Sequence, residues 1–87
     1  MNEFTFSKTG FNQYLYWQAQ DRKTLRKIND LLIDIQRNGP MKGKGKPEAL
    51  KYRPGYSRKI DDKNRLVYDI DGAQNILIIS CRGHYEE

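Results

Sequence analysis

The stretch Asn75-Ile76-Leu77-Ile78-Ile79-Ser80-Cys81-Arg82, followed at once by Gly83-His84-Tyr85, decides the fold that we predict. It is the most apolar run of the chain and is rich in β-branched residues. A helix would need a polar side, whereas a strand covered on both faces fits such a run. We therefore predict that residues 75–82 form the central strand of a sheet, which ends beside the only histidine of the chain.

Working outward, two further strands are predicted at residues 56–60 and 65–70. The turn before the final strand contains Asp71-Gly72, a dipeptide typical of hairpins. Residues 3–6 alternate polar and apolar side chains, which indicates a short edge strand. Residues 48–51 fit either one helical turn or the start of a strand, and the sequence leaves this open.

Two helices are predicted between the first strand and the others. Ser7 and Asp21 are suitable N-caps, and Asn38-Gly39-Pro40 is a helix end. Apolar residues at helical spacing follow each cap: Phe11, Tyr14 and Leu15 in the first helix, and Leu25, Ile28, Leu32 and Ile35 in the second, over residues 22–37. The predicted fold is α+β, with the order β-α-α-β-β-β and a helical hairpin packed on an antiparallel sheet.

Length and composition restrict the class of protein. A chain of 87 residues forms one domain, residues 1–87. No apolar run approaches the roughly 20 residues of a membrane span, and the N-terminus does not resemble a signal peptide. The single cysteine, Cys81, cannot form an internal disulfide, so we expect a reducing cytoplasm. We expect Cys81 to be a small buried residue rather than a reactive one.

The net charge of +5 is concentrated in the middle of the chain. Residues 40–65 contain nine Lys and Arg against three Asp and Glu, a local charge of +6. Such a patch on a small domain is typical of a surface that binds a polyanion, above all nucleic acid. The alternative is a solvated face that keeps the protein soluble.

The side chains available for chemistry fit RNA cleavage without a metal. One histidine and one cysteine cannot supply a zinc site, and Gly43-Lys44-Gly45-Lys46 lacks the spacing of a phosphate-binding loop. Cleavage through the 2′-hydroxyl needs a base, a cation for the phosphate and an acid for the leaving oxygen. Glu48, Arg65 and His84 are candidates for these roles. By pattern alone, however, a terminal histidine is more often an ordinary surface residue.

Six segments together resemble the YoeB (Txe/YoeB) family of the RelE-like bacterial toxins, over nearly the whole chain: Tyr14-Leu15-Tyr16-Trp17-Gln18, Lys27-Ile28-Asn29, Gly43-Lys44-Gly45-Lys46-Pro47-Glu48, Ser57-Arg58, Arg65-Leu66-Val67-Tyr68 and Cys81-Arg82-Gly83-His84-Tyr85. The resemblance implies a RelE-like, microbial-ribonuclease-like fold. It also implies a ribosome-dependent endoribonuclease that cuts mRNA in the A site, without a cofactor. The implied partners are the ribosome, mRNA, a cognate YefM/Phd-like antitoxin and a second copy of the chain.

The same resemblance implies roles for individual residues. Glu48 would be the general base, His84 the general acid, Arg65 the stabiliser of the transition state and Tyr85 a residue that positions the substrate. The residues expected to contact RNA, from the resemblance and from the basic segment, are Lys44, Lys46, Lys51, Arg58 and Lys59.

The chain departs from the family pattern at three places. Lys59 stands where the family commonly has a second arginine, the aromatic run before Ser57 is reduced to Gly55-Tyr56, and Glu86-Glu87 follow the His-Tyr end. Two other functions stay open at this point: a ParE-like gyrase poison of the same fold, and a basic RNA- or ribosome-binding module without catalysis. Tyr16 and Trp17 fit helix packing, or else a dimer or antitoxin surface.

Overall fold

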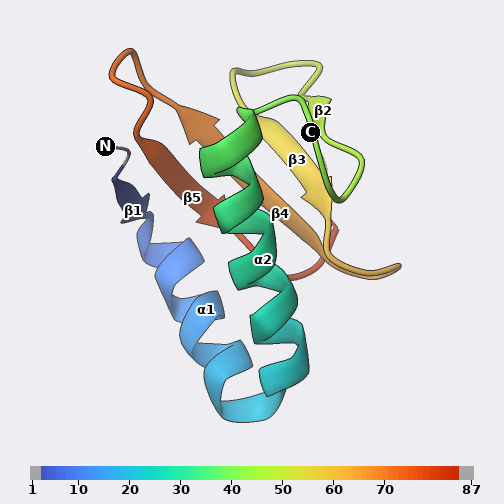
Figure 1. Cartoon of the computed structure of the whole chain (residues 1–87). Coiled ribbons are helices and arrows are strands. Elements are labelled where there is room, and N and C mark those ends of the chain that lie inside the picture. Colours follow the sequence, from blue (N-terminus) through green and yellow to red (C-terminus); the bar gives the residue numbers. More distant parts are fainter. Residues whose placement is uncertain (1–2, 85–87) are drawn as a thin grey trace.

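A helical hairpin and a five-stranded sheet make up this computed structural model, which describes residues 3–84 (Figure 1). The predicted α+β order is confirmed, and the open question at residues 48–51 is settled by a two-residue strand. In chain order the elements are β1 (Phe4–Phe6), α1 (Lys8–Gln20), α2 (Arg22–Asn38), β2 (Glu48–Ala49), β3 (Tyr56–Lys59), β4 (Arg65–Ile70) and β5 (Ile76–Ser80). Neither helix has the length and apolar character that a membrane span requires.

Side-chain caps set the ends of the hairpin where the sequence predicts them. Ser7 Oγ accepts a hydrogen bond from the Gly10 amide at 2.9 Å, which begins α1. The Asp21 carboxylate accepts from two amides in the first turn of α2, so one residue ends α1 and begins α2. Gly39 ends α2 with a φ of 86°, which glycine adopts without steric cost.

The start of α1 lies directly against the backbone of β5. The Ser7 amide donates to the Ile78 carbonyl at 2.9 Å, and Ser7 Oγ donates to the Ile79 carbonyl at 2.7 Å. A Cβ atom at Gly10 would lie 2.5 Å from the Ile78 carbonyl oxygen, so glycine alone permits this approach. Helix α1 is therefore fixed to the strand that leads to the histidine.

The sheet has the strand order β1-β5-β4-β3-β2. Strand β1 lies at an edge, as predicted, but it pairs with β5 in parallel, whereas the other pairs are antiparallel. The sheet is therefore mixed rather than fully antiparallel. The central strand is β4, so our prediction that the apolar stretch 75–82 forms the central strand is wrong: β5 is the neighbour of the centre.

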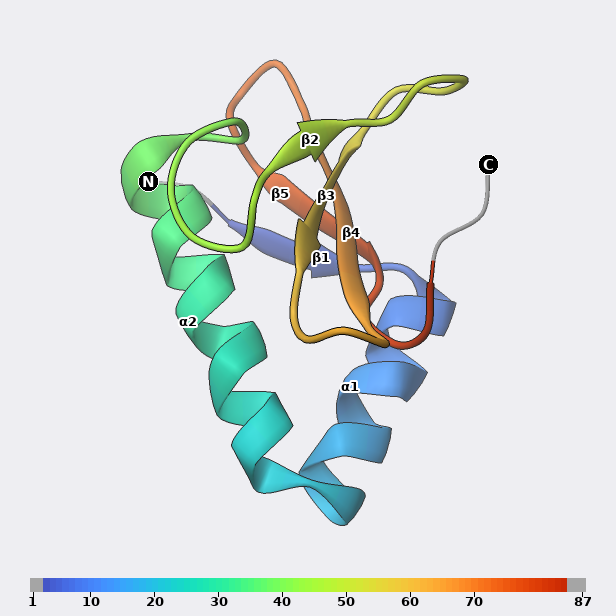
Figure 2. The ribbon, with the colours of Figure 1, turned by 90° about the vertical axis from the view of Figure 1, so that its right-hand side faces the viewer.

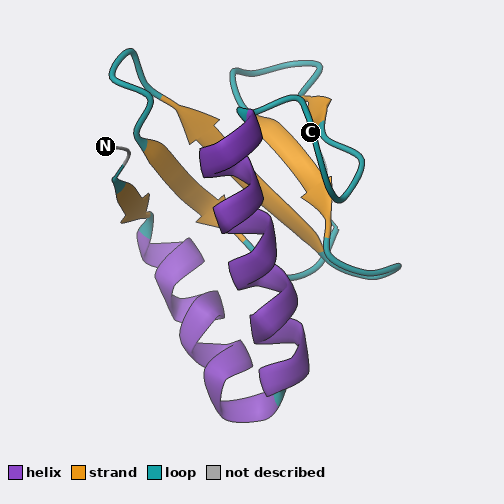
Figure 3. Cartoon of the chain, viewed as in Figure 1, coloured by secondary structure: helices purple, strands orange, loops and turns teal. Residues whose placement is uncertain are grey.

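The core lies between the hairpin and one face of the sheet, with α2 running across the sheet in Figure 3. In β5, Ile76 and Ile78 are 1% and 0% exposed, whereas Leu77 between them is 37% exposed. The helices thus cover one face of β5 and not both. Our prediction that this strand is covered on both faces is therefore also wrong. The buried cluster includes Trp17, Ile28, Leu31, Leu32, Ile35, Ile60, Leu66, Tyr68, Ile76, Ile78 and Cys81. Of the apolar helix residues named from the sequence, Ile28, Leu32 and Ile35 are buried and Tyr14 and Leu25 are partly buried, whereas Phe11 and Leu15 are 48% and 42% exposed.

Candidate active site

The register of β2, β3 and β4 brings two of the predicted catalytic residues, Glu48 and Arg65, onto one face of the sheet. Glu48 pairs with Ser57, and Arg65 pairs with Lys59. Successive side chains of a strand point to opposite faces, so Ser57 and Lys59 lie on one face of β3 and Arg58 on the other. Arg58 reaches the helix α2, so the face with Glu48 and Arg65 is the one turned away from α2.

A hollow of about 180 Å³ lies on this face. Its lining residues are Lys46, Glu48, Ser57, Lys59 and Arg65, and we call it the β2–β4 hollow. It contains the predicted base, the predicted stabilising cation and two of the five residues expected to contact RNA. One carboxylate among three cations gives a local positive charge, which favours a phosphate group.

Arg65 is held in the hollow by the turn between β3 and β4. Its Nη1 donates to the carbonyls of Asp61 and Asn64 at 2.8 and 3.1 Å. These two bonds use two of the five N–H donors of a guanidinium. An arginine anchored in this way has lost much of its side-chain freedom before any phosphate binds, so less entropy remains to be lost on binding.

The backbone before His84 is attached to the same turn. The Gly83 amide donates to Asn64 Oδ1 at 2.8 Å, and the Arg65 amide donates to the Gly83 carbonyl at 3.0 Å. His84 follows directly and is exposed. In Figure 2 the red segment at the end of the described chain lies on the side of the sheet away from α2. The structure thus brings the chain at His84 to Arg65, whereas Tyr85 lies outside the described residues.

Helix α1 holds the preceding residues of the chain end. Trp17 Nε1 donates to the Cys81 carbonyl at 2.8 Å, and Gln13 Oε1 accepts from the amides of Cys81 and Arg82 at 2.7 and 3.1 Å. Trp17 is therefore a packing residue, one of the two roles that the sequence left open. The sequence analysis missed Gln13 and Asn64. Gln13 is one helical turn before Trp17, a spacing that could have indicated a shared face.

The other lysines expected to contact RNA lie outside the β2–β4 hollow. Lys44 lines an adjacent hollow of about 160 Å³, together with Lys27 and Lys59. Lys51 is exposed after β2. Lys59 borders both hollows and also pairs with Asp62 at 2.9 Å. The cations therefore continue beyond the predicted catalytic residues, along the basic segment.

Arg58 does not lie where we expected it. Its side chain is 0% exposed on the helix side of the sheet, so it cannot contact RNA there. Its Nη1 donates to Asp34 Oδ2 at 2.6 Å and its Nε donates to the Tyr68 hydroxyl at 2.8 Å. The strand alternation places Arg58 inward while Lys59 points outward, and the prediction that Arg58 binds RNA is therefore wrong.

Cys81 is buried, as predicted, and 0% exposed. Burial raises the pKa of its thiol to about 11, which disfavours the reactive thiolate at neutral pH. Within residues 3–84, no three His, Cys, Asp or Glu side chains gather in a way that could hold a metal ion.

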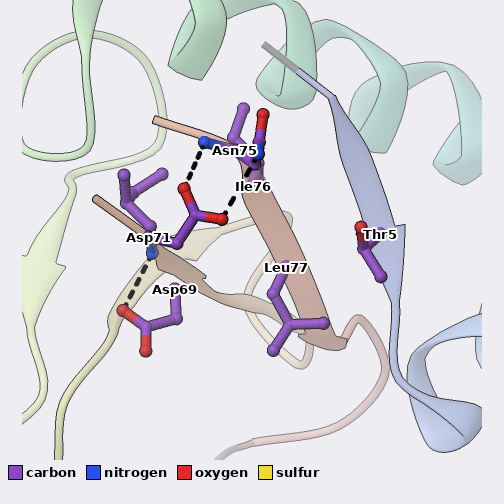
Figure 4. A pocket seen from close by; sticks show the side chains of 7 residues that line it. Thr5, Asp69, Asp71, Asn75, Ile76 and Leu77 are labelled. Atoms are coloured by element: carbon purple, nitrogen blue, oxygen red, sulfur yellow. Dashed lines mark hydrogen bonds between the residues drawn. The ribbon is translucent and has the colours of Figure 1, made fainter. Parts of the chain in front are cut away.

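A further hollow, of about 270 Å³, lies at the opposite end of β4 and β5 (Figure 4). Its polar side chains take part in the local backbone structure: Asp71 accepts from the Asn75 amide at 2.9 Å, and Asp69 accepts from the Ile70 amide at 2.8 Å. None of the predicted catalytic or RNA-binding residues lines it. We therefore assign the candidate site to the β2–β4 hollow.

The carboxyl group of Asp34 is expected to make the free energy of unfolding depend on pH. A hydrogen bond from the Lys44 amide and then the Arg58 guanidinium lower the pKa of Asp34, against the opposing effect of burial. Because this folded-state pKa lies below the unfolded value of about 3.9, the stabilisation is present above that pH and is lost as the pH falls through the folded-state pKa. We expect Asp34→Asn to flatten the decrease in unfolding free energy below about pH 4, measured by urea denaturation. Equal pH dependence in the two proteins would contradict this.

The fold is shared with solved toxins of bacterial toxin–antitoxin systems, and this gives the class of protein. A family described as "YoeB-like toxin of bacterial type II toxin-antitoxin system" matches residues 6–85. This chain belongs to that family.

Known relatives are similar to this chain over almost its full length. The toxin YoeB of Streptomyces coelicolor is 47% identical over 83 residues, which cover 93% of this chain and 96% of the relative. Two solved structures from Staphylococcus aureus are each 46% identical. One is the heterotetrameric YoeB–YefM toxin–antitoxin complex, with a TM-score of 0.89 and coverage of 98% of this chain and 99% of that one. The other is a YoeB dimer, with a TM-score of 0.90 and coverage of 97% and 98%.

Proposed function

We propose that this YoeB-like toxin is an endoribonuclease that enters the ribosomal A site, cuts mRNA there and so inhibits translation in the cytoplasm. The observation that carries the proposal is the β2–β4 hollow, where Glu48 and Arg65 meet among lysines, and where Gly83, the residue before His84, accepts a hydrogen bond from the Arg65 amide. Binding alone would not need a carboxylate beside a phosphate site, since the carboxylate would repel the phosphate.

The proposed reaction uses acid–base chemistry. The carboxylate of Glu48 takes the proton from a 2′-hydroxyl, and the freed oxygen attacks the adjacent phosphorus. Arg65, with Lys46 and Lys59, donates to the phosphate oxygens, on which negative charge increases in the transition state. The bond from phosphorus to the 5′-oxygen breaks, and His84 donates a proton to that oxygen. Tyr85 would position the nucleotide, and no metal or cofactor enters the scheme.

The proposed partners follow from the relatives and from charge. The S. aureus relative forms a heterotetramer with YefM, so we propose a YefM/Phd-like antitoxin for this chain, and a homodimer in its absence. We also propose that Lys44 and Lys51, outside the hollow, contact phosphates of the ribosome or mRNA. Long cationic side chains at such positions add affinity that falls with salt.

The proposal is tested by primer extension on an mRNA held on programmed ribosomes. We expect discrete cuts in the A-site codon that need both the protein and the ribosome. A single 2′-deoxynucleotide on the 5′ side of the cut should abolish cleavage, because the attacking oxygen is absent. The matched control carries the 2′-deoxynucleotide in a codon outside the A site and should be cut as the unmodified mRNA is.

Two results would contradict the proposed endoribonuclease activity. Binding to the ribosome without cuts would favour a basic ribosome-binding module. Inhibition of DNA gyrase supercoiling without any effect on mRNA would favour a ParE-like poison of the same fold. Cleavage that persists with the 2′-deoxy mRNA would leave a nuclease but exclude the mechanism through the 2′-hydroxyl.

A further inference from the structure

Arg58 uses every one of its N–H donors inside the protein. Nε donates to the Tyr68 hydroxyl and Nη1 donates to Asp34 Oδ2. The remaining three donors reach backbone carbonyls of the loop that follows α2. The acceptors and distances are Lys44 O at 2.9 Å, Gly39 O at 2.9 Å and Lys42 O at 2.7 Å. A guanidinium has five N–H donors, so none is left for another ligand.

The partners of Arg58 bind the same loop. Asp34 Oδ2 accepts from the Lys44 amide at 2.9 Å, and the Tyr68 hydroxyl donates to the Pro40 carbonyl at 2.6 Å. We call Arg58, Asp34 and Tyr68 the Arg58 cluster, and residues 39–47 the basic loop. Three side chains from α2, β3 and β4 thus hold one surface loop at four backbone carbonyls and one amide.

The basic loop leads straight into the β2–β4 hollow. The Gly45 carbonyl accepts a hydrogen bond from the Lys59 amide at 2.6 Å, which attaches the loop to the end of β3. Lys46 then has a φ of 51°, a left-handed conformation that is unfavourable for a residue with a side chain. Glu48 follows two residues later in β2. A strained backbone at this position persists only where neighbouring contacts hold it.

We propose that the Arg58 cluster is a positioning device for catalysis: by fixing the basic loop, it sets where Lys46 and Glu48 lie relative to Arg65. The proposal rests on the proposed endoribonuclease function and deepens it, since Arg58 itself never touches the RNA. Resistance of the loop to movement matters because a displacement of about 1 Å at a reacting group can cost on the order of 10²-fold in rate.

A guanidinium is required for this arrangement. Lysine keeps the charge but offers three donors from one atom, whereas the five acceptors around Arg58 surround a planar fork. In Arg58→Lys we therefore expect two or more loop carbonyls to lose their partner. Tyr68→Phe is the milder variant, because it removes the hydroxyl that links Arg58 to Pro40 and keeps the ring in the core.

The test measures cleavage rate against toxin concentration on programmed ribosomes, well below the unfolding temperature. We expect Arg58→Lys to lower the maximal rate roughly 10- to 100-fold, with little change in the half-saturating concentration. Tyr68→Phe should lower the maximal rate by a smaller factor. The matched controls are Arg26→Lys, on the exposed face of α2, and Tyr14→Phe, which loses only a hydrogen bond to Asn29. Both controls should cleave like the wild type.

Amide hydrogen exchange provides a readout that does not depend on cleavage. The Lys44 amide donates to Asp34 and the Lys59 amide donates to the Gly45 carbonyl. In both cluster variants these two amides should exchange faster, while the amides of β5 stay protected. Wild-type maximal rates in both variants would overturn the proposal, as would a loss that lies wholly in the half-saturating concentration. If the wild type cuts no mRNA, the proposed function fails by itself. Unchanged loop exchange would then overturn the holding role of the cluster, and faster exchange would support it.

Discussion

His84→Gln is expected to cut ribosome-bound mRNA about 10²- to 10⁴-fold more slowly than the wild type, the range that a general acid or base contributes. Glutamine is close in size and can still form hydrogen bonds, but it cannot donate a proton to the leaving 5′-oxygen. His84 is exposed, so its replacement leaves the core untouched. The measurement is the single-turnover rate at saturating toxin, with ribosome binding measured separately by sedimentation.

Arg82→Gln is the control for this variant. Arg82 is in the same chain end, but its guanidinium lies 3.7 Å from the centre of the Tyr16 ring on α1. We expect at most a few-fold change in rate, because Arg82 does not line the β2–β4 hollow. A rate for His84→Gln close to that of the wild type would remove His84 from the mechanism. A loss of ribosome affinity as large as the loss of rate would make it a binding residue instead.

The parts of the fold that depend on local chemistry could be predicted from the sequence. Ser7, Asp21 and Gly39 are caps because their side chains or allowed φ values satisfy helix ends without help from distant residues. The alternation in residues 3–6 similarly identified an edge strand. The partner of that strand could not be predicted, because its parallel pairing with β5 joins residues more than seventy positions apart.

In the candidate site, too, some features could be predicted from the sequence and others depend on residues that are distant in the chain. Glu48, Lys59 and Arg65 meet because of strand register, which the turns largely determine. The direction of Arg58 could have been inferred from that of Lys59, since neighbours in a strand alternate. Its partners could not, because a buried arginine is stable only beside acceptors that the fold brings from α2 and from the basic loop. The resemblance and the charge of the basic segment therefore assigned to RNA one cation that stabilises the fold instead.

Arg58→Met should destabilise the protein more than Asp34→Asn or Tyr68→Phe. Removing one partner of a buried ion pair costs about 3–5 kcal/mol, because the other charge stays buried without compensation. Asp34 is 12% exposed and keeps the hydrogen bonds from the Lys44 amide and from Asn38, so its own contribution lies below that range. The methionine would, in addition, leave three loop carbonyls without their donor. Small domains are stable by about 5–15 kcal/mol, so urea denaturation should show a large fall in the midpoint. If the variant is unfolded in buffer, an excluded osmolyte such as sucrose should restore the transition.

The double variant with Asp34→Asn separates the ion pair from the rest of the cluster. Alone, Asp34→Asn should destabilise, because it weakens the bonds to Arg58 and to the Lys44 amide. In the Arg58→Met background it should be neutral or stabilising, since the neutral amide no longer needs a guanidinium. Residues in direct contact couple by about 0.5–3 kcal/mol, so the sign is measurable. Additive effects would mean that Arg58 stabilises the protein through the loop carbonyls alone. As a control, a separate double-mutant cycle on the exposed ion pair Lys59–Asp62 should show little coupling.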